Sequence, residues 1–380
     1  MTDSSATIGR ALRLAGTPLP VVGRARVYAC GITPYATTHL GHAATFVRVD
    51  LAVRVLRSLG VSVELCRNVT DVDDDILRAA QRAGTPYDQL AAVQQFRFDR
   101  DMAALGVRAP DHEPRIHRHV DDVVRLASHL VTRGSAYVAD GSVFFVGDDV
   151  PARAGLDRAE ALAALHQGAD AGGGSDVEPN GRRSPLDAVL WQRAAAGEPA
   201  WPSPWGPGRP GWHAGCTAMA MTVLGNAVDL HAGGSDLRFP HHAYEAAQAE
   251  AVSGVTPFAR AWMHIGTVAV DGAKMAKSTG NLVLVSDLLA EHRPAALRML
   301  LLDRRWNEPW DYATAQLPAA EARVDGLYAA AGRPREAPAA DQAVVLALLD
   351  DLDVPRAVEV ATEEGGSAAR TAIRLLGLPA

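Results

Sequence analysis

The chain has 380 residues, of which 48% are hydrophobic and 21% charged, and its net charge of −7 argues against a broad nucleic-acid-binding face, although a local basic patch stays possible. This length allows two or three domains, and the lack of any apolar run of about 18 residues excludes a transmembrane helix. Residues 1–16 lack the apolar stretch of a secretory signal, and three scattered cysteines exclude a disulfide framework, so we expect a cytoplasmic protein.

The first predicted elements form a strand–helix–strand unit. Residues 26–31 have the composition of a strand, and a helical pattern follows over 38–59, with Gly60 as the residue that ends it. Residues 61–68 alternate apolar and polar side chains, which indicates a second strand. Two strands joined by a helix within about 40 residues predict a parallel sheet with a right-handed crossover.

The middle of the chain is mixed. Residues 72–135 are mostly helical by their apolar period, and residues 136–147 predict a hairpin that turns at Asp140-Gly141. The Gly-rich stretch 168–185 predicts a flexible loop, and 201–212 is too rich in Pro and Gly for regular structure.

A second α/β segment precedes a helical end. We expect a strand near 228–232, a helix over 241–253 and a strand over 262–270. From about residue 287 the pattern is helical and rich in Ala and Leu, interrupted by a linker at 332–340. There is no internal repeat.

The basic residues are unevenly divided: 35 are Arg and two are Lys, namely Lys274 and Lys277 in the stretch GAKMAKSTGN. With 70 Ala residues, the composition indicates a coding bias that replaces exposed Lys by Arg. The two remaining lysines therefore predict a place where a compact ammonium is needed instead of a guanidinium. The stretch lacks the second Gly of a P-loop, so a Walker nucleotide site is not predicted. Two lysines here could instead neutralise the charge on a leaving pyrophosphate.

A second motif, His39-Leu40-Gly41-His42, begins the first predicted helix. A helix N-terminus after a parallel strand favours anions, and two imidazoles add hydrogen-bond donors there. Gly41 would let a nucleotide approach closely, although helix-capping or metal-binding histidines are an equal alternative for this motif alone. HLGH and KMAKS together are far more specific than either motif.

These two motifs resemble the HIGH and KMSKS signatures of class I aminoacyl-tRNA synthetases. The surrounding segments are similar to the cysteinyl branch and, within it, to the cysteine ligases of the mycothiol pathway, over about residues 20–380: CGITPYATTHLGHAAT, RNVTDVDD, SPLDAVLW, GRPGWHAGC, GGSDLRFPHH and KMAKSTGN. The resemblance implies an α/β fold: a Rossmann catalytic domain with a parallel sheet, an inserted connective segment and a C-terminal helical bundle. The expected divisions are residues 1–110 and 201–286 for the two catalytic halves, 111–200 for the insertion and 287–380 for the helical domain.

The resemblance also implies a zinc site. From spacing alone, Cys30, Cys216 and His241 fit a buried core as well as a metal site. The family's zinc ligands fall on these three positions, and Glu245 stands where the synthetases supply a fourth ligand. Zn²⁺ with an open position would take the thiolate of a substrate cysteine. Cys66 matches no motif and is expected to be structural.

The implied activity is a two-step ligation. L-Cysteine and ATP, with Mg²⁺, would give cysteinyl-adenylate and pyrophosphate, and a small amine such as glucosaminyl-inositol would then displace AMP. The charge-stabilising residues would be His39, His42, Lys274 and Lys277. The acidic run at 71–75 is expected to cap the next helix and face solvent. The adenylate is expected along Cys30, Gly31, Ile32, Thr33, Thr45, Asn68, Val69, Thr70, Trp212, Gly234, Ser235, Asp236 and Val268.

Several positions depart from the family pattern, and they leave the acceptor open. They are Ala232, Gly215, Ala243, Ala276 and the synthetase-like His231. A paralogue that uses another amine is therefore compatible with the sequence. A tRNA-charging synthetase is the first alternative, disfavoured because about 90 residues follow the lysine stretch. A non-catalytic zinc-binding protein is the second. We expect a monomer that binds neither tRNA nor membranes.

Overall fold

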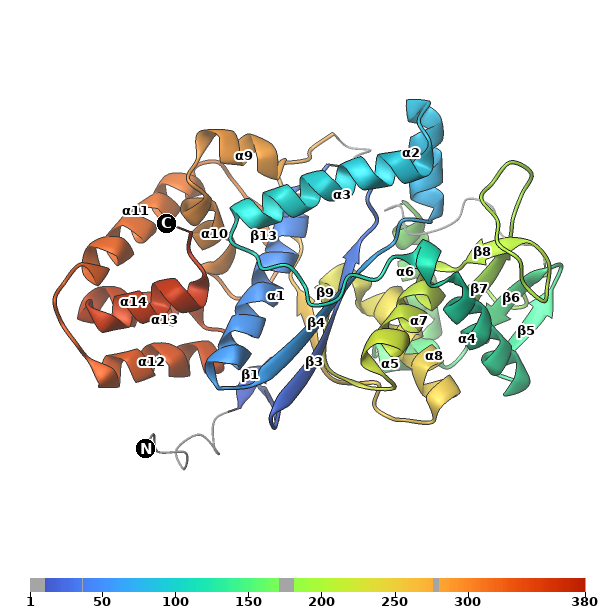
Figure 1. Ribbon diagram of the computed structural model, residues 1–380, viewed down its shortest axis with the longest axis horizontal. Coiled ribbons are helices and arrows are strands. Elements are labelled where there is room, and N and C mark those ends of the chain that lie inside the picture. Colours follow the sequence, from blue (N-terminus) through green and yellow to red (C-terminus); the bar gives the residue numbers. More distant parts are fainter. Residues whose placement is uncertain (1–10, 36, 171–180, 276–279, 380) are drawn as a thin grey trace.

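The computed structural model describes residues 11–35, 37–170, 181–275 and 280–379, and a parallel sheet lies at its centre (Figure 1). The strands are β3 (Arg24–Ile32), β4 (Ser62–Val69), β9 (Val228–Gly234) and β10 (Ala259–Ile265), in the order β10-β9-β3-β4. All three neighbouring pairs are parallel. The predicted strand–helix–strand unit and the parallel sheet are therefore confirmed.

Helices cover both faces of this sheet. On one face, α1 (Leu40–Ser58) crosses from β3 to β4 and packs on α10 (Pro294–Leu302). On the other face, α7 (Trp212–Leu224) packs on β3 and β4, and α4 (Val120–Thr132) and α8 (Ala243–Ser253) pack against α7. The buried residues accordingly form two apolar cores, one for each face. This two-sided burial is seen in β3, where the consecutive residues Val27, Tyr28 and Ala29 are all buried.

An antiparallel sheet stands apart at one end of the molecule (right in Figure 1). Its strands, in spatial and chain order, are β5 (Ala136–Ala139), β6 (Ser142–Phe145), β7 (Ala188–Arg193) and β8 (Gly208–Pro210). The predicted hairpin is confirmed, and Asp140 and Gly141 at its turn have positive φ values of 49° and 79°. Asp and Gly tolerate this backbone region, which a two-residue hairpin turn requires.

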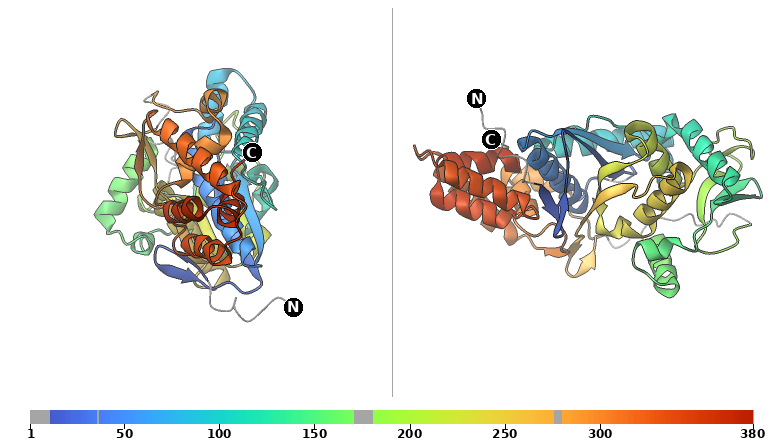
Figure 2. Two further views of the ribbon diagram at one scale, coloured as in Figure 1. Left: turned by 90° about the vertical axis from the view of Figure 1, so that its left-hand side faces the viewer. Right: turned by 90° about the horizontal axis from the view of Figure 1, so that it is seen from below.

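A bundle of the last four helices, α11–α14, occupies the opposite end, as the right view of Figure 2 shows. Among the described residues, no helix is both long and apolar enough to cross a membrane. The remaining elements are β1 (Leu12–Leu14), β2 (Thr17–Leu19), α2 (Asp74–Ala83), α3 (Tyr87–Ala104), η1 (Ile116–Arg118), α5 (Val150–Arg153), α6 (Arg158–Asp170), η2 (Ser235–Leu237), η3 (Arg238–His242), β11 (Val268–Val270), β12 (Ala273–Lys274), α9 (Val285–Glu291), β13 (Trp310–Tyr312), α11 (Gln316–Ala331), α12 (Pro338–Leu349), α13 (Val354–Glu364) and α14 (Ser367–Leu376).

Three sequence predictions need correction. The stretch 201–212 does contain regular structure, because β8 pairs with β7 as an edge strand and α7 begins at its last residue. The predicted strand over 262–270 is two strands in different sheets, β10 and β11, which are separated at Gly266, where the backbone of Glu308 passes closely. The predicted loop 168–185 begins inside α6, and its residues 171–180 lie outside the described part of the chain.

One buried arginine fastens α1 to the C-terminal helices. The guanidinium of Arg298 on α10 donates to Asp50 Oδ2 on α1 at 2.5 Å and to the carbonyl of Leu376 on α14 at 2.6 Å. A third hydrogen bond of 2.9 Å reaches the carbonyl of Leu105. Arg298 is fully buried, so its charge is satisfied by these partners alone. The helix that carries HLGH is therefore held at its middle by the C-terminal part of the chain.

Candidate active site

The predicted site residues gather at the carboxyl ends of β3, β4 and β9. The chain continues from β3 to α1 on one side and returns through β9 on the other, so the sheet changes direction here, where open α/β folds bind ligands. Gly31 at the end of β3 donates its N–H to Asn68 Oδ1 at 2.9 Å. A Cβ at Gly31 would overlap the Asn68 carbonyl, so only glycine permits this approach.

Four buried metal-binding side chains converge beneath this edge: Cys30, Cys216, His241 and Glu245. Their ligand atoms all lie within 4.8 Å of one another. His241 Nε2 lies 3.2 Å from Glu245 Oε1, and Cys30 Sγ lies 3.6 Å from the same oxygen. These separations match the about 3.3–3.8 Å edges of a tetrahedron with ordinary Zn–N, Zn–O and Zn–S bonds. The donor set therefore fits a zinc ion.

The surrounding elements hold these donors in place. His241 and Glu245 lie one helical turn apart, where η3 leads into α8. The Nδ1 of His213 lies 2.8 Å from the Nδ1 of His241, which leaves Nε2 of His241 directed at the cluster. The ring of Trp212 stacks on His241 at 4.2 Å and is only partly buried, so Trp212 is placed to cover the site. Such outer contacts orient a ligand and fix its tautomer.

Opposite charges stabilise the cluster even with no ion between them. Burial lowers the pKa of His241, but Glu245 and Cys216 overcome this effect and raise it to about 10. The hydrogen bond from Cys30 lowers the pKa of Cys216 to about 7. Burial of the thiol opposes this shift, and the charge of His241 adds to it. Burial opposes ionisation of Glu245, yet His241 and His231 hold its pKa well below the ordinary value. A thiolate and a carboxylate are thus favoured where a cation would bind.

A second group of possible ligands has Cys30 and Glu245 in common with the first. Its members are Cys30, His231, His242 and Glu245. His231 Nε2 lies 3.0 Å from Glu245 Oε2, and His242 Nδ1 lies 2.9 Å from His264 Nε2. We infer no metal preference for this group, because it has a single thiol. Sequence reasoning missed His242 and His264 as neighbours of the site, although three of the 13 histidines fall within 231–242 and a fourth follows at 264.

The structure brings HLGH and the lysine stretch together. Leu40 N donates to the carbonyl of Val283 at 2.9 Å, and Val285 N donates to the carbonyl of Thr38 at 3.1 Å, so the segment after the lysine stretch pairs with the start of α1. The methyl of Met275 lies 3.6 Å from the position a Cβ on Gly41 would take. Lys277 lies outside the described residues.

The two histidines of HLGH are neutral at neutral pH. Their rings stack at 3.8 Å, and His39 caps α1 by accepting a hydrogen bond from Gly41 N at 3.1 Å. Burial lowers the pKa of His39 to about 2, assisted by His42 and Lys274, and burial lowers the pKa of His42 to about 4. A ligand at this point would therefore meet neutral N–H groups of the two rings and the dipole of α1, and no full positive charge from the histidines.

Lys274 is paired with a predicted ligand-binding residue. Its Nζ lies 2.7 Å from Asp236 Oδ2, and the two side chains are 50% and 44% exposed. Asp236 is one of the residues expected to bind the adenylate. In this structure its carboxylate is paired with the lysine, so a ligand that binds Asp236 must displace Lys274.

Most of the other predicted adenylate residues adjoin this edge. Thr70 N donates to the carbonyl of Ile32 at 2.9 Å, and Asn68 Nδ2 donates to Thr70 Oγ1 at 3.1 Å. Val268 differs, because it is buried in β11 within the apolar core. The rest lie at the ends of β3 and β9, on α1 and at the end of β4: Thr33, Gly234, Ser235, Thr45 and Val69.

The acidic run after β4 does not all face solvent as expected. Asp73 caps α2 by accepting from Asp75 N at 2.9 Å, which confirms the predicted cap. Asp71, however, is only 5% exposed. Cys66 is fully buried in the apolar core and belongs to neither ligand group, in agreement with a structural role.

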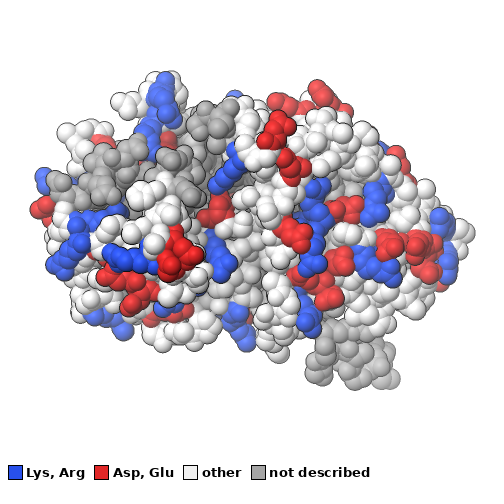
Figure 3. Space-filling model, turned by 180° about the vertical axis from the view of Figure 1, so that it is seen from behind, with Lys and Arg blue, Asp and Glu red and all other residues white. Residues whose placement is uncertain are grey.

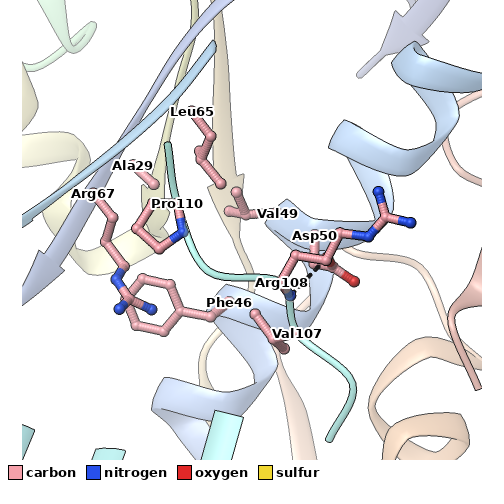
Figure 4. Close-up of a pocket in the computed structure, with 9 residues that line it drawn as sticks. All are labelled: Ala29, Phe46, Val49, Asp50, Leu65, Arg67, Val107, Arg108 and Pro110. Carbon is pink, nitrogen blue, oxygen red and sulfur yellow. Dashed lines mark hydrogen bonds between the residues drawn. The ribbon is translucent and has the colours of Figure 1, made fainter. Parts of the chain in front are cut away.

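A cavity beneath α1 contains none of this chemistry (Figure 4). It lies between β3, β4, α1 and the segment 107–110, and Asp50 at its wall accepts a hydrogen bond from Arg108 N at 3.2 Å. Arg67 in the wall is already paired with Asp99 at 2.8 Å and lies over Phe98. The carboxylate of Asp50 and the guanidinium of Arg67 are both occupied by partners within the chain, so the cavity is a gap between packed elements.

The chain matches a known family over most of its length. The family model described as tRNA synthetases class I (C) catalytic domain matches residues 20–322. The cysteine–tRNA ligase of Alkalilimnicola ehrlichii is 44% identical over 356 residues, which cover 90% of this chain and 74% of that one. The L-cysteine:1D-myo-inositol 2-amino-2-deoxy-alpha-D-glucopyranoside ligase of Frankia alni is 46% identical over 341 residues, which cover 88% and 81%.

A solved structure supports the fold alone. The Mycobacterium tuberculosis methionyl-tRNA synthetase in complex with methionyl-adenylate superposes with a TM-score of 0.62 at 19% identity, covering 94% of this chain and 82% of that one. The expected Rossmann-type catalytic domain with a helical C-terminus is thus confirmed. The family model and the sequence relatives show that the chain belongs to the class I tRNA synthetase (C) catalytic-domain family.

Proposed function

We propose that this protein is an ATP-dependent ligase that activates L-cysteine as cysteinyl-adenylate and transfers it to a small amine. The observation that carries the proposal is the buried thiol–thiol–imidazole–carboxylate cluster at the same sheet edge as HLGH and Lys274. The buried cluster suits a thiol-bearing substrate, and HLGH with Lys274 suits the phosphates of ATP. Relatives named as cysteine ligases, at 44–46% identity, support the same activity.

Selection of cysteine would rest on the cluster. Cys30, Cys216 and His241, with Glu245 as fourth donor, would hold a zinc ion, which when bound supplies a soft acceptor for a thiolate. The protein excludes bulk water there, because all four donors are at most 4% exposed. Trp212, stacked on His241, would pack against the substrate.

Adenylation would use the adjoining edge. The substrate carboxylate attacks the α-phosphate of ATP, which would bind with Mg²⁺, and pyrophosphate leaves. His39 and His42 donate N–H groups to the phosphates as neutral rings, while Lys274 and Lys277 neutralise the charge that develops on the leaving group. Lys274 must first release Asp236, which then becomes available to the substrate ammonium or the ribose hydroxyls. Glycine at position 31 leaves room for the adenylate beside Asn68.

The acceptor is proposed to be a small amine because the described residues of the helical end carry more acidic than basic side chains, which disfavours a tRNA backbone. Residues 287–380 contain ten arginines and no lysine, against fifteen carboxylates. Arg323, Arg335 and Arg356 already pair with carboxylates at 2.8, 2.8 and 2.6 Å. On the face in Figure 3, acidic and basic side chains are interspersed over the bundle at the right. Phosphate backbones are bound by arginines and lysines that are free to contact them.

Glucosaminyl-inositol is the first acceptor to test, since relatives such as the Frankia alni ligase carry its name. A tRNA remains the second candidate, favoured by the 44% identity to the Alkalilimnicola ehrlichii cysteine–tRNA ligase. The departures at Ala232, Gly215 and Ala243 lie beside the site, and they allow a different amine.

The test has two stages. Pyrophosphate exchange into ATP should depend on L-cysteine, and L-serine should support at least about 100-fold less exchange, because a hydroxyl cannot replace the metal-bound thiolate. Glucosaminyl-inositol and total tRNA are then offered in parallel to the preformed adenylate. Exchange without cysteine dependence would contradict the adenylation proposal, and charging of tRNA alone would contradict the proposed acceptor.

A further inference from the structure

An aspartate–histidine pair lies at the same sheet edge as the candidate site. His117 on η1 places Nδ1 2.5 Å from Asp71 Oδ2, and its backbone N donates to Asp71 Oδ1 at 3.2 Å. The Asp71 side chain is 7% exposed and that of His117 is 39% exposed. A buried carboxylate thus fixes the ring through Nδ1. Nε2 makes no hydrogen bond to any part of the chain that the structure describes.

The pair adjoins the adenylate residues on both sides. Asp71 directly follows Asn68-Val69-Thr70, and the segment before η1 runs parallel to β4, with Val69 N donating to the carbonyl of Pro114 at 2.8 Å. The neighbouring Ile116 packs on α7, where its Cδ1 lies 2.7 Å from the position of a Cβ on Gly215. The η1 turn that carries His117 therefore lies between the end of β4 and α7, the helix that carries Trp212 and Cys216.

We propose that His117 is the general base that deprotonates the amine acceptor, with Asp71 as its positioning residue. This inference rests on the proposed transfer of cysteine to an amine. A sugar amine is largely protonated near neutral pH and must lose a proton before it can attack. An imidazole held by a carboxylate at Nδ1 and accessible at Nε2 is suited to accept that proton.

The proton balance of the step is complete. Nε2 of His117 takes one proton from the acceptor ammonium and later releases it to water. The free amine attacks the adenylate carbonyl, so that a carbon–nitrogen bond forms and the carbon–oxygen bond to phosphate breaks. The leaving phosphate oxygen keeps that electron pair and takes the second proton from nitrogen, which gives an amide and AMP.

Other titratable groups on the packed elements are engaged elsewhere. On α4, Asp122 lies 2.7 Å from the Nδ1 of His119. On α7, His213 is bonded to His241 and Cys216 belongs to the thiol cluster. Arg115 and Arg118 flank the ring on its own segment. Asp71 is thus the carboxylate that contacts His117.

The decisive variant is His117→Asn, because the Asn amide can still donate to Asp71 in place of Nδ1–H while the base is lost. Single-turnover transfer from preformed cysteinyl-adenylate is measured with glucosaminyl-inositol, with glucosamine and with hydroxylamine. Hydroxylamine is largely unprotonated at neutral pH and needs no base. Transfer to the two sugar amines should fall about 100-fold or more at pH 7, while transfer to hydroxylamine and pyrophosphate exchange stay near wild-type.

Three further measurements separate catalysis from structure. The deficit of His117→Asn should shrink as pH rises, since more acceptor is then free amine. Asp71→Asn should lower transfer to the sugar amines, and the double variant should be no worse than His117→Asn, because the two residues act as one unit. His112→Asn removes a similarly exposed ring, paired with Glu64 at 2.8 Å on the same segment, and should behave as wild-type.

Each contrary result has a distinct meaning. Wild-type transfer rates in His117→Asn would overturn the inference alone. An equal loss with hydroxylamine and in exchange would also overturn it and make His117 structural. Failure of wild-type protein to transfer to either sugar amine, with exchange intact, would overturn both the acceptor and this inference, whereas absent exchange would contradict the adenylation proposal.

Discussion

The two halves of the candidate site differ in exposure. Cys30, Cys216, His241 and Glu245 are at most 4% exposed, whereas Lys274 and Asp236 are about half exposed. Buried donors are held by packing and strong mutual charges, and they suit recognition of one side chain. An exposed ion pair is weak and screened by salt, so it can be exchanged for a ligand at little cost. Under the proposed function, the buried cluster would discriminate between substrate side chains, and the exposed Lys274–Asp236 pair would open to admit a ligand.

The largest expected effect is on the buried half. Cys216→Ser should remove the zinc ion that the cluster is proposed to hold and lower cysteine-dependent pyrophosphate exchange by about 1,000-fold, or about 4 kcal/mol, because the substrate thiolate would lose its soft acceptor. Zinc content by atomic emission gives a readout that does not depend on activity. Cys66→Ala, which removes a buried thiol outside the cluster, is the matched control and should keep its zinc. Equal zinc content in Cys216→Ser and Cys66→Ala would show that Cys216 does not hold the ion.

Lys274→Ala should lower exchange by about 100-fold, since loss of one donor to developing charge costs this much in other enzymes. Lys274→Arg should restore less than a tenth of the exchange rate that Lys274→Ala loses, because a planar guanidinium cannot replace a compact ammonium. The melting temperature should change little in either variant, since the ion pair to Asp236 is exposed.

The control for this prediction is Arg335→Ala, which removes an exposed cation that is also paired with a carboxylate, Glu364 at 2.8 Å. It should retain wild-type exchange. Full activity of Lys274→Arg would mean that any cation serves at this position, and the scarcity of lysine would then have no functional meaning.

The smallest effect is a pH dependence of stability from HLGH. Burial lowers the pKa of His42 to about 4, below the about 6.5 of an unfolded histidine. The unfolded state therefore binds more protons between these values, so stability is present above about pH 6.5 and is lost as pH falls towards 4. His42→Gln should reduce the slope of unfolding free energy against pH by up to about 1.4 kcal/mol per unit.

Urea unfolding of both proteins from pH 7 to 5 measures this difference, and the other titrating groups cancel in the comparison. Parallel slopes would show that His42 is protonated in the folded state, which would contradict its role as a neutral donor.

The sequence predicted the elements whose signal is local. The helix before Gly60 and the hairpin at Asp140-Gly141 follow from apolar period and turn chemistry, and both were correct. One strand was predicted over 262–270 where the structure has two. They are separated at Gly266, which lies against the backbone of the distant Glu308, and no local pattern encodes that contact. The edge strand at 208–210 was missed because proline and glycine occur at sheet edges as well as in loops.

The site was predictable only in part, for a similar reason. Resemblance to a family indicated Cys30, Cys216 and His241, which spacing alone left undecided. The histidine neighbours at 242 and 264 were missed, since they meet through the pairing of separate elements. The same holds for Asp71 and His117, which are 46 residues apart, and for the ion pair between Lys274 and Asp236.

The buried Arg298 has a consequence for building chimaeras. Its partner Asp50 lies in the middle of the helix that begins with HLGH, while Arg298 itself belongs to the C-terminal half. Asp50 keeps a second partner, Arg54, at 2.6 Å, but a C-terminal segment that carries Arg298 would lose its buried carboxylate if it were joined to a relative without Asp50, at a cost of about 3–5 kcal/mol. The helical bundle is therefore not an interchangeable part, and recombination between such ligases should succeed only where this pair is inherited as a unit.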